Sequence, residues 1–242
     1  MNILIPMAGD GSRFRQNGKH IIKPLIDIKG KPMAIRAIET LGLKGKLIIV
    51  LRKNEDGELI RATLKKYIDD FAVIWSEGPT EGPACSALLA KDLVNNNDPL
   101  IITNCDQIMT WDSFAFSKFL ESVDYDGVIV TYFCDKEKNS YARCGVDGLV
   151  DLVLEKVILS DISLNGIHYW KRGSDFVWSA EEMIRTNGRS VNGEFYISQT
   201  YNYLINNGQS VGIYHIPNSW HHAVGIPEDL ETFLNNANIR LK

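Results

Sequence analysis

The sequence has few of the residues and segments that mark several large classes of protein. Only four cysteines occur in 242 residues, and none forms a C-x-x-C pair, which favours buried free thiols in a reducing cytoplasm. No apolar run approaches the roughly 20 residues of a membrane span. Residues 1–7 are apolar but lead directly into a glycine-containing segment, unlike a secretory leader. We therefore expect a cytoplasmic protein without a membrane partner.

The chain also lacks an excess of positively charged residues. The 26 Lys and Arg residues are outnumbered by 30 Asp and Glu residues, for a net charge of −4, so the chain lacks the electrostatic footprint of a nucleic-acid-binding protein. This argues against a polymerase-like or DNA-modifying role and against a nucleic-acid partner. With 45% hydrophobic residues, the chain is long enough to bury a large core as one domain. Its oligomeric state stays open, and a homo-oligomer is compatible with this composition.

The first 110 residues alternate between two hydrophobic periods. Apolar runs without polar alternation, typical of strands buried on both faces, lie at 2–6, 46–51, 71–75 and 100–103. Helical patterns occupy 32–43, which ends at Gly42, and also 56–69 and 83–94. Because strand–helix alternation implies right-handed crossovers and a mostly parallel sheet, we predict a doubly wound α/β layer.

The pattern changes after residue 125. A strong strand is predicted at 127–134, shorter ones at 141–146, 149–156 and 166–170, and helices at 174–186, 198–207 and 227–236. No Pro- or Ser-rich linker and no repeat separates the halves. We therefore predict a single domain, 1–242, in which residues 111–242 complete the sheet and add a substrate-binding flap.

A glycine-rich segment, Met7-Ala8-Gly9-Asp10-Gly11-Ser12-Arg13-Phe14, follows the first predicted strand directly. Glycines at such a turn let backbone N–H groups converge on phosphate oxygens, and Arg13 adds a planar, permanently charged fork. A tight turn alone would also explain the two glycines. The dinucleotide fingerprint does not fit, since its third glycine is replaced by Phe14, and the Gly-Lys-Ser/Thr of a P-loop is absent.

This segment, together with Lys23-Pro24-Leu25 and Gly30-Lys31-Pro32, resembles the start of the sugar-nucleotide pyrophosphorylase (nucleotidyltransferase) family, whose pattern is roughly G-x-G-S/T-R-L/F, then P-K-P-L, then G-K-P. The resemblance implies a Rossmann-like nucleotidyltransferase fold with a mixed, mostly parallel sheet flanked by helices. It also implies an NTP-binding half, 1–110, and an acceptor-binding half, 111–242. Arg13 and Lys23 would contact the NTP phosphates and stabilise the leaving pyrophosphate, and Ala8, Gly9, Gly11 and Ser12 would bind the nucleotide.

Further segments resemble the family in the same order along the chain. Gly82, within Glu81-Gly82-Pro83-Ala84, would pack against the base. Asp106 follows the fourth predicted strand, where the family places a metal-binding aspartate. A carboxylate at the carboxyl end of a parallel strand faces the ligand crevice, and Mg²⁺ is usually held by one or two carboxylates plus phosphate; a cap on the following turn is the other explanation of Asp106. The expected acceptor-binding residues are Gly145, Glu155, Lys156, Asn165 and Glu194.

These residues support transfer without a nucleophilic side chain. A phosphate monoester is largely dianionic near neutrality, so its oxygen attacks the α-phosphorus of an NTP without a general base. The catalyst needs cations and positioning. We predict a Mg²⁺-dependent enzyme that joins an NMP to a phosphorylated small molecule, with CTP or UTP favoured as donor and a sugar 1-phosphate as acceptor.

The sequence departs from the family near its C-terminal end. Where the family commonly supplies a second metal carboxylate in a W-x-D-x-G-like segment, this chain has Trp220-His221-His222-Ala223-Val224-Gly225. Histidine is a poor Mg²⁺ ligand. A zinc site is disfavoured because adjacent histidines on a strand point to opposite faces, and a contact between His222 and the acceptor is the preferred interpretation. The Arg15–Gly18 stretch also departs from the hexose enzymes, which leaves room for an unusual acceptor.

Three alternative functions therefore stay open. The first is a cytidylyltransferase for a non-sugar phosphate such as phosphocholine or a phospho-amino acid. The second is a glycosyltransferase of related architecture, although Asn104-Cys105-Asp106 is only half of its usual D-x-D motif. The third is an inactive sensor that binds nucleotide sugars.

Overall fold

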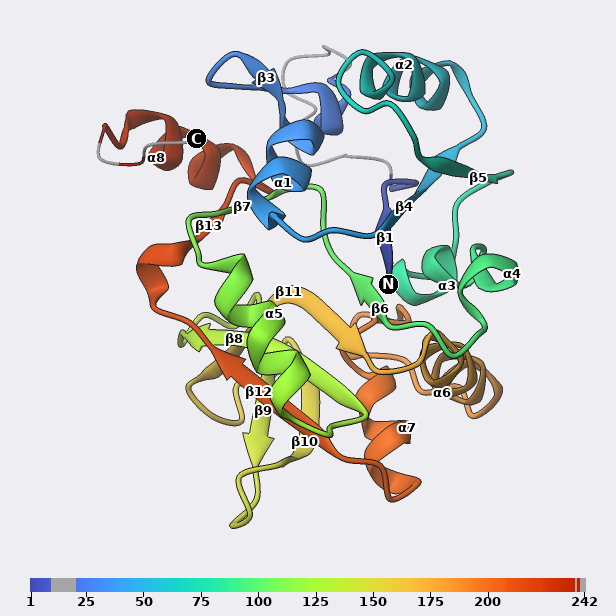
Figure 1. Ribbon diagram of the computed structural model, residues 1–242, viewed down its shortest axis with the longest axis vertical. Coiled ribbons are helices and arrows are strands. Elements are labelled where there is room, and N and C mark those ends of the chain that lie inside the picture. Colours follow the sequence, from blue (N-terminus) through green and yellow to red (C-terminus); the bar gives the residue numbers. More distant parts are fainter. Residues whose placement is uncertain (10–20, 238, 240–242) are drawn as a thin grey trace.

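The computed structural model describes residues 1–9, 21–237 and 239 and shows a layered α/β fold (Figure 1). Within these residues the central sheet has nine strands, and β12, β8, β11, β6, β1, β4 and β5 follow one another across it while β9 and β10 extend it from β11. The strands are β1 (Asn2–Pro6), β4 (Lys46–Arg52), β5 (Ala72–Ser76), β6 (Leu100–Ile102), β8 (Gly127–Phe133), β9 (Ser140–Cys144), β10 (Val150–Glu155), β11 (Ile162–Trp170) and β12 (Val211–His215).

The pairings make this sheet mixed but mostly parallel. β1 pairs in parallel with β4 and β6, β4 with β5, and β8 with β12, whereas β11 is antiparallel to β6, β8 and β9. Among the described strands of this sheet, β11 and β10 therefore run against the other seven. The predicted fold class is confirmed.

Helices cover both faces of the sheet. They are α1 (Met33–Leu41), α2 (Glu55–Leu64), α3 (Pro83–Leu88), α4 (Lys91–Val94), α5 (Ser113–Ser122), α6 (Gly173–Arg185), α7 (Thr200–Asn206) and α8 (Pro227–Asn235). Short 3₁₀ turns lie at Lys23–Leu25 and Asn218–Trp220, and two-stranded ribbons pair β2 (Asp27–Ile28) with β3 (Lys31–Pro32) and β7 (Gln107–Met109) with β13 (His221–Ala223). No described helix is long and apolar enough to span a bilayer.

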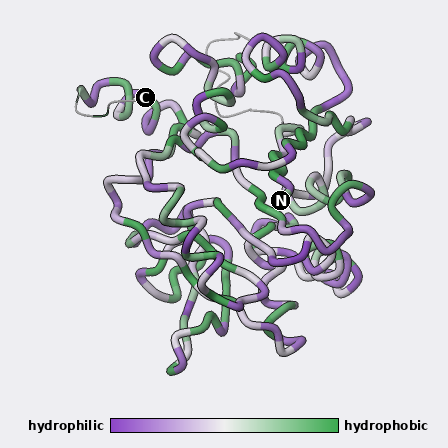
Figure 2. Tube along the Cα trace, in the orientation of Figure 1, coloured by the Kyte–Doolittle hydropathy of each residue, from purple (hydrophilic) through white to green (hydrophobic). Residues whose placement is uncertain are grey.

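Alternate residues of the central strands enter two separate hydrophobic cores. Leu4 and Ile48 pack with α3, α4, α6 and α7 on one face, while Ile3 and Ile49 pack with α1, α2 and α5 on the other. This arrangement explains why the strands read as continuous apolar runs, since both of their faces are buried. Figure 2 shows hydrophobic segments running through the middle of the molecule and hydrophilic ones in its outer turns. A third, smaller core joins Val224 and Phe233 to Ile28 and Ile108.

Most predicted elements are found, with ends shifted by a few residues. The first predicted helix ends as expected, because Gly42 adopts the left-handed conformation (φ 66°) that terminates α1. The prediction of one helix at 83–94 is wrong. The N–H groups of Leu89 and Ala90 donate to carbonyls three residues earlier, as in a 3₁₀ turn, and this tighter turn divides the segment into α3 and α4. The sequence pattern also missed α5, β7, β12 and β13.

Candidate active site

The loop after β1 begins in a well-anchored position. Ala8 is buried, and its carbonyl oxygen accepts hydrogen bonds from Nε (3.1 Å) and Nη2 (2.7 Å) of Arg52 at the end of β4. Gly9 is exposed, and a Cβ there would meet no atom within 4 Å. Gly11, Ser12 and Arg13 lie outside the described residues, so their contacts with the NTP stay predictions.

Two of the predicted site residues meet at the carboxyl end of β6. Lys23 Nζ lies 2.5 Å from Asp106 Oδ2, and both side chains are largely shielded from solvent, at 19% and 23% exposed. The C-terminal segment closes the same spot: Val224 N donates to the Asp106 carbonyl (2.9 Å), and a Cβ on Gly225 would lie only 2.5 Å from Asp106 Oδ2. Glycine at 225 therefore lets the backbone pass close to the carboxylate and to Lys23 Nζ without a side chain in between.

Gly82 allows the backbone of the first half of the chain to pass close to the backbone of the second half at Phe195. Its φ of +139° and the 2.5 Å that would separate a Cβ from the Phe195 carbonyl oxygen both exclude a larger residue. The surrounding backbone is paired, since Phe195 N donates to the Glu81 carbonyl (2.9 Å) and Ala84 N to the Phe195 carbonyl (3.0 Å). Gly82 thus positions α3, whose first residue, Pro83, lines a cavity.

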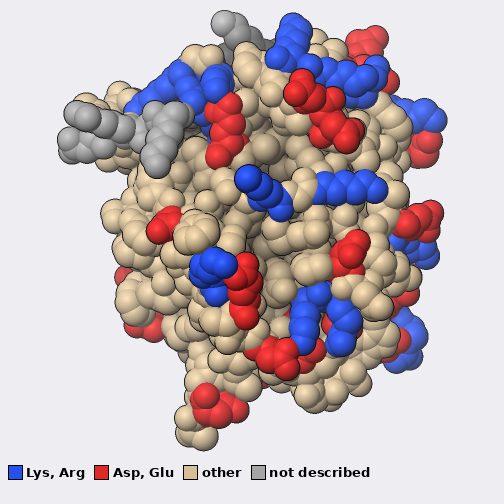
Figure 3. All heavy atoms as spheres, viewed as in Figure 1, with Lys and Arg blue, Asp and Glu red and all other residues tan. Residues whose placement is uncertain are grey.

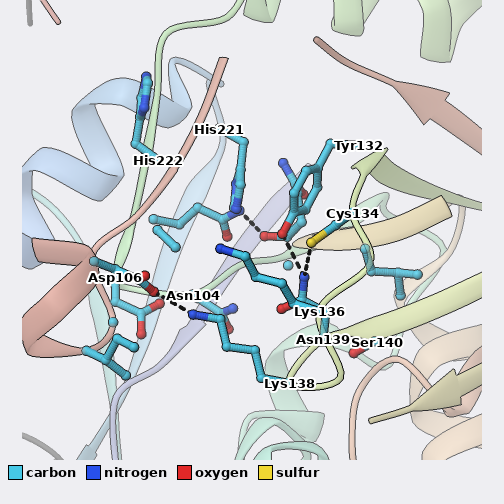
Figure 4. Close-up of a pocket in the computed structure, with 18 of the residues that line it drawn as sticks. Asn104, Asp106, Tyr132, Cys134, Lys136, Lys138, Asn139, Ser140, His221 and His222 are labelled. Carbon is cyan, nitrogen blue, oxygen red and sulfur yellow. Dashed lines mark hydrogen bonds and ion pairs between the residues drawn. The ribbon is translucent and has the colours of Figure 1, made fainter. Parts of the chain in front are cut away.

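That cavity, of about 880 Å³, brings residues of both halves together (Figure 4). Five of the predicted site residues line it: Asp106, Glu155, Lys156, Asn165 and His222. Asp106 comes from the edge of the parallel strands, and the others come from the second half of the chain. In Figure 3, positive and negative side chains intermingle over the face of the molecule that is turned toward the viewer.

Glu155 is a buried carboxylate at the end of β10. It is 6% exposed, and its Oε2 accepts hydrogen bonds from the hydroxyl groups of Ser140 and Ser198. Burial raises the pKa of Glu155, and the two hydroxyl donors oppose that rise. The carboxylate is therefore held rigidly at the cavity wall, ready to accept hydrogen bonds from a ligand hydroxyl or amine.

Lys156 and Glu194 are joined through Tyr196. Lys156 Nζ donates to the Tyr196 hydroxyl (2.7 Å), and that hydroxyl donates to Glu194 Oε2 (2.6 Å). Burial, followed by the neighbouring Glu194, raises the pKa of Tyr196, which stays a neutral donor. Glu194 does not line the cavity itself, but this relay connects it to Lys156, which does.

Asn165 lies where a strand irregularity bends β11 toward the cavity. Its Oδ1 accepts from Ile167 N (2.9 Å), and its carbonyl accepts from Gln107 Nε2. Gly166, at φ +94°, lies so close to Asn104 that a Cβ would come within 2.5 Å of Asn104 Nδ2. The Asn-Gly pair therefore packs β11 against the segment that carries Asp106.

Gly145 does not reach the cavity. It opens the turn between β9 and β10, where its N–H donates to the Leu149 carbonyl (2.8 Å), and it is absent from the described cavity lining. The Gly145-Val146-Asp147-Gly148 sequence is typical of a tight turn, and the tip of this hairpin lies at the outer end of the sheet (Figure 1). The structure thus does not support Gly145 as an acceptor-binding residue.

The two adjacent histidines of β13 point to opposite faces, as predicted. His222 Nε2 lies 3.1 Å from Thr110 Oγ1, and its ring packs on Phe233 at 5.6 Å. His221 packs on Tyr132 at 4.2 Å, and its Nδ1 lies 2.8 Å from Gln107 Nε2. His222 is thus turned toward α8, and His221 is the histidine directed at the side chains around Tyr132 (Figure 4). Among the described residues, no three His, Cys, Asp or Glu side chains are grouped to hold a metal ion.

One stretch of the cavity wall, residues 132–140, was not predicted from the sequence, and neither was the place of His221 in that wall. This stretch runs from the end of β8 to the start of β9 and includes Tyr132, Cys134, Lys136 and Asn139, all of which line the cavity. β8 runs in the same direction as β6, so its carboxyl end meets the same crevice. The rule that singled out Asp106 would therefore have found the polar residues after the strand predicted at 127–134.

A layered sheet with a polar cavity at the carboxyl ends of its parallel strands defines an α/β protein built to bind a nucleotide-like ligand. Residues 3–156 match the MobA-like NTP transferase domain family. Because this match covers well over half of the 242 residues, the chain belongs to that family of nucleotidyltransferases. The predicted resemblance to nucleotide-sugar pyrophosphorylases is confirmed.

Individual proteins are similar to this chain in sequence or in fold. A mannose-1-phosphate guanyltransferase from Kluyveromyces lactis is 32% identical over 166 residues, which cover 65% of this chain and 46% of the relative; the match thus spans less than half of that protein. The structure of a nucleoside-diphosphate-sugar pyrophosphorylase from Vibrio cholerae RC9 superposes with a TM-score of 0.81 at 21% identity, covering 97% of this chain and 100% of the other. A UDP-glucose pyrophosphorylase complexed with UDP-glucose gives a TM-score of 0.73 at 16% identity, with 97% of each chain covered.

Proposed function

We propose that this protein transfers an NMP from an NTP to a phosphorylated small molecule and releases pyrophosphate. The observation that carries this proposal is the meeting of Lys23 and Asp106 at the carboxyl end of β6, beside a cavity that also contains Glu155 and Lys156. The two residue pairs come from different halves of the chain, and each pair contains one lysine, which supplies a separate cation for each of two anionic substrates. An acceptor phosphate oxygen bonds to the α-phosphorus of the NTP while the bond from that phosphorus to the β-phosphate bridge oxygen breaks.

The chain's own residues position and neutralise these anions. Lys156, directed into the cavity and hydrogen-bonded to Tyr196, holds the acceptor phosphate. Lys23 and Arg13 neutralise the pyrophosphate that leaves. Glu155 and Asn165 accept and donate hydrogen bonds to the remainder of the acceptor. Catalysis then depends on positioning and charge, and no covalent enzyme intermediate forms.

The surroundings of Asp106 fit a magnesium ion. Its carboxylate is a hard oxygen ligand, with Oδ2 paired to Lys23 Nζ, and Gly225 brings no side chain against that oxygen. The Gln107 Oε1 atom in the next residue is buried without a protein partner among the described residues. Mg²⁺ needs few protein carboxylates when phosphates complete its coordination. We therefore propose Asp106 as its protein ligand; when bound, the ion would stabilise charge on the NTP phosphates.

We propose a sugar 1-phosphate as acceptor and CTP or UTP as donor, with a non-sugar phosphate as the second acceptor class. The similarity to a mannose-1-phosphate guanyltransferase and to a UDP-glucose pyrophosphorylase supports the sugar phosphate. Those two names point to different bases, so each of the four NTPs has to be compared directly.

The decisive experiment measures pyrophosphate release with each NTP, with and without Mg²⁺, across phosphorylated sugars, polyols, amino acids and amino alcohols. Release that requires both an acceptor and Mg²⁺ is the expected result. Release of NDP from a nucleotide sugar would instead identify a glycosyltransferase, and binding without turnover would identify a sensor. A trapped nucleotidylated protein would contradict direct transfer.

A further inference from the structure

One part of the cavity wall carries hydrogen-bond donors that the proposed function does not use. This β8–β9 wall consists of residues 132–140, which run from the end of β8 to the start of β9, and of His221 in β13. Its C-terminal end adjoins the proposed acceptor residues, because the Asn139 carbonyl accepts from Lys156 N and Ser140 Oγ donates to Glu155 Oε2. Its polar groups point toward the space between the β8–β9 loop and β13 (Figure 4). Two of them, Lys136 and His221, are hydrogen-bond donors that line the cavity.

Lys136 is the cation of this wall that has no partner among the described residues. Lys138 Nζ lies 2.9 Å from Asp229 Oδ2, whereas Lys156 donates one hydrogen bond to Tyr196 and keeps two further N–H groups for the acceptor phosphate. Lys136 Nζ makes no hydrogen bond or ion pair with any described residue. In Figure 4 the Lys136 side chain extends away from its loop into the cavity, whereas Lys138 reaches out to its partner. Asp135 also lines the cavity next to Lys136.

His221 is fixed as a donor by its neighbour Gln107. A backbone carbonyl can only accept, so the Gln107 side-chain atom that faces the Asn165 carbonyl is Nε2. The same Nε2 lies 2.8 Å from His221 Nδ1, which must accept from it. The neutral ring then carries its proton on Nε2. The Tyr132 ring, tilted by 32° with its centroid 4.2 Å from that of His221, holds the orientation of the imidazole. Burial, reinforced by the neighbouring His222, lowers the pKa of His221 to about 4, so the ring is neutral near pH 7.

An ammonium and an N–H donor on one wall suit a ligand group that is negatively charged and only accepts hydrogen bonds. In the proposed function the phosphate to be activated is already matched by a different cation, Lys156. We propose that the β8–β9 wall binds a carboxylate, so that the acceptor is a phosphorylated small molecule that also carries a carboxylate group. This inference rests on the proposed transfer function and specifies its acceptor class.

Pairs of acceptors that differ only in a carboxylate test the inference. Glucuronic acid 1-phosphate is compared with glucose 1-phosphate, and O-phosphoserine with O-phosphoethanolamine, which also separates a sugar acid from an amino acid. The expected result is that the carboxylated member of at least one pair has a kcat/KM at least about tenfold higher, the size expected for a charge-assisted contact.

Variants connect that preference to the wall. Lys136→Gln should remove the tenfold preference, chiefly through KM, and Lys136→Arg should restore it, because the charge returns. Lys138→Gln is the matched control on the same loop, and the preference should persist in it. His221→Phe keeps the ring against Tyr132 and should weaken the same preference.

The possible outcomes separate this inference from the proposed function. Equal turnover of both members in each pair would overturn the carboxylate site while leaving the transferase function intact. A Lys136→Gln effect that is the same for both members would place Lys136 on the shared phosphate and would likewise overturn it. The absence of pyrophosphate release with every acceptor would overturn the proposed function, and the inference with it.

Discussion

In the first half of the chain, the residues proposed to handle the NTP follow directly on parallel strands, as Asp106 follows β6 and Ala8 follows β1. In the second half, the cavity residues come from a hairpin, a loop and a strand near the C-terminal end, as with Glu155, Lys136 and His221. In the first half, each of these residues is positioned by the strand directly before it in the sequence. In the second half, the cavity residues are brought together by pairings between segments far apart in the sequence. A change at the parallel edge should therefore affect the reaction itself, whereas changes in the second half should affect acceptor choice or packing.

The largest expected effect comes from the parallel edge. Asp106→Asn keeps the shape of the side chain but removes the negative charge, and kcat should fall by roughly 10²–10³-fold or more because transition-state charge stabilisation is lost. Steady-state pyrophosphate release at saturating NTP measures it. Asp229→Asn, another cavity carboxylate but one in the second half, should change kcat far less. Similar losses in both variants would contradict the separate roles of the two halves.

The contact between the halves is tested next. Gly82→Ala forces a Cβ to 2.5 Å from the Phe195 carbonyl at a φ of +139°, and we expect a loss of about 3 kcal/mol in the free energy of unfolding. Gly78→Ala is the matched control, because a Cβ there meets no atom within 4 Å. Urea denaturation followed by circular dichroism compares the two. Equal stability would mean that the close approach of the two backbones is not required.

A pH effect of about 2 kcal/mol is expected at β11, the strand that joins the halves through β6 and β8. Burial lowers the pKa of His168 from 6.5 to about 3. Between these two pH values His168 is protonated in the unfolded chain and neutral in the folded one. Stability is therefore unchanged by this group above pH 6.5 and falls as the pH drops from 6.5 toward 3. Between pH 7 and pH 5 the loss is about 2 kcal/mol.

Urea denaturation at the two pH values measures this loss. His168→Gln should show a smaller decrease than the wild type, whatever its absolute stability, while His221, with a pKa lowered to about 4, contributes its own part in both proteins. An undiminished decrease in the variant would assign the pH dependence to other groups.

The smallest effect is expected for the ion pair that connects the β8–β9 loop to α8. Lys138 and Asp229 are 48% and 27% exposed, so solvent screens their attraction and Lys138→Gln should cost less than about 1 kcal/mol. The change in melting temperature at low and high salt measures it. A loss above 2 kcal/mol would mean that α8 depends on this bridge rather than on its small hydrophobic core around Phe233.

The sequence predicted those features that depend on local patterns. The buried strands follow from apolar runs such as Lys46–Arg52, the end of α1 follows from Gly42, and the place of Asp106 follows from the strand before it. These signals lie within a few residues of the feature that they specify. For this reason the parallel half of the fold, and the place of Asp106 at its carboxyl edge, were accessible before the structure. The pairing of Lys23 with Asp106, which are 83 residues apart, was not predicted.

The remaining features of the site depend on pairings between distant segments, which no local sequence pattern predicts. β13 is three residues long, and its alignment with β7 decides which histidine faces Tyr132. The order of motifs along the chain suggested Gly145 as a site residue, but the β9–β10 hairpin carries it away from the cavity. Gln107, which connects Asn165 to His221, has no signature of its own in the sequence.

The pairing of β13 with β7 also has a consequence for folding: we expect the wall that contains β13 to form after the parallel strands of the first half. Residues 107–109 are synthesised long before residues 221–223, which complete their ribbon, and contacts between distant segments form late because closing a long loop costs entropy. The parallel strands of the first half can therefore assemble while the cavity still lacks one wall. During synthesis, Asp106 would stay open to water until Val224 and Gly225 arrive beside it. A chain stopped before residue 220 should accordingly keep much of its parallel sheet but lose the enclosed cavity.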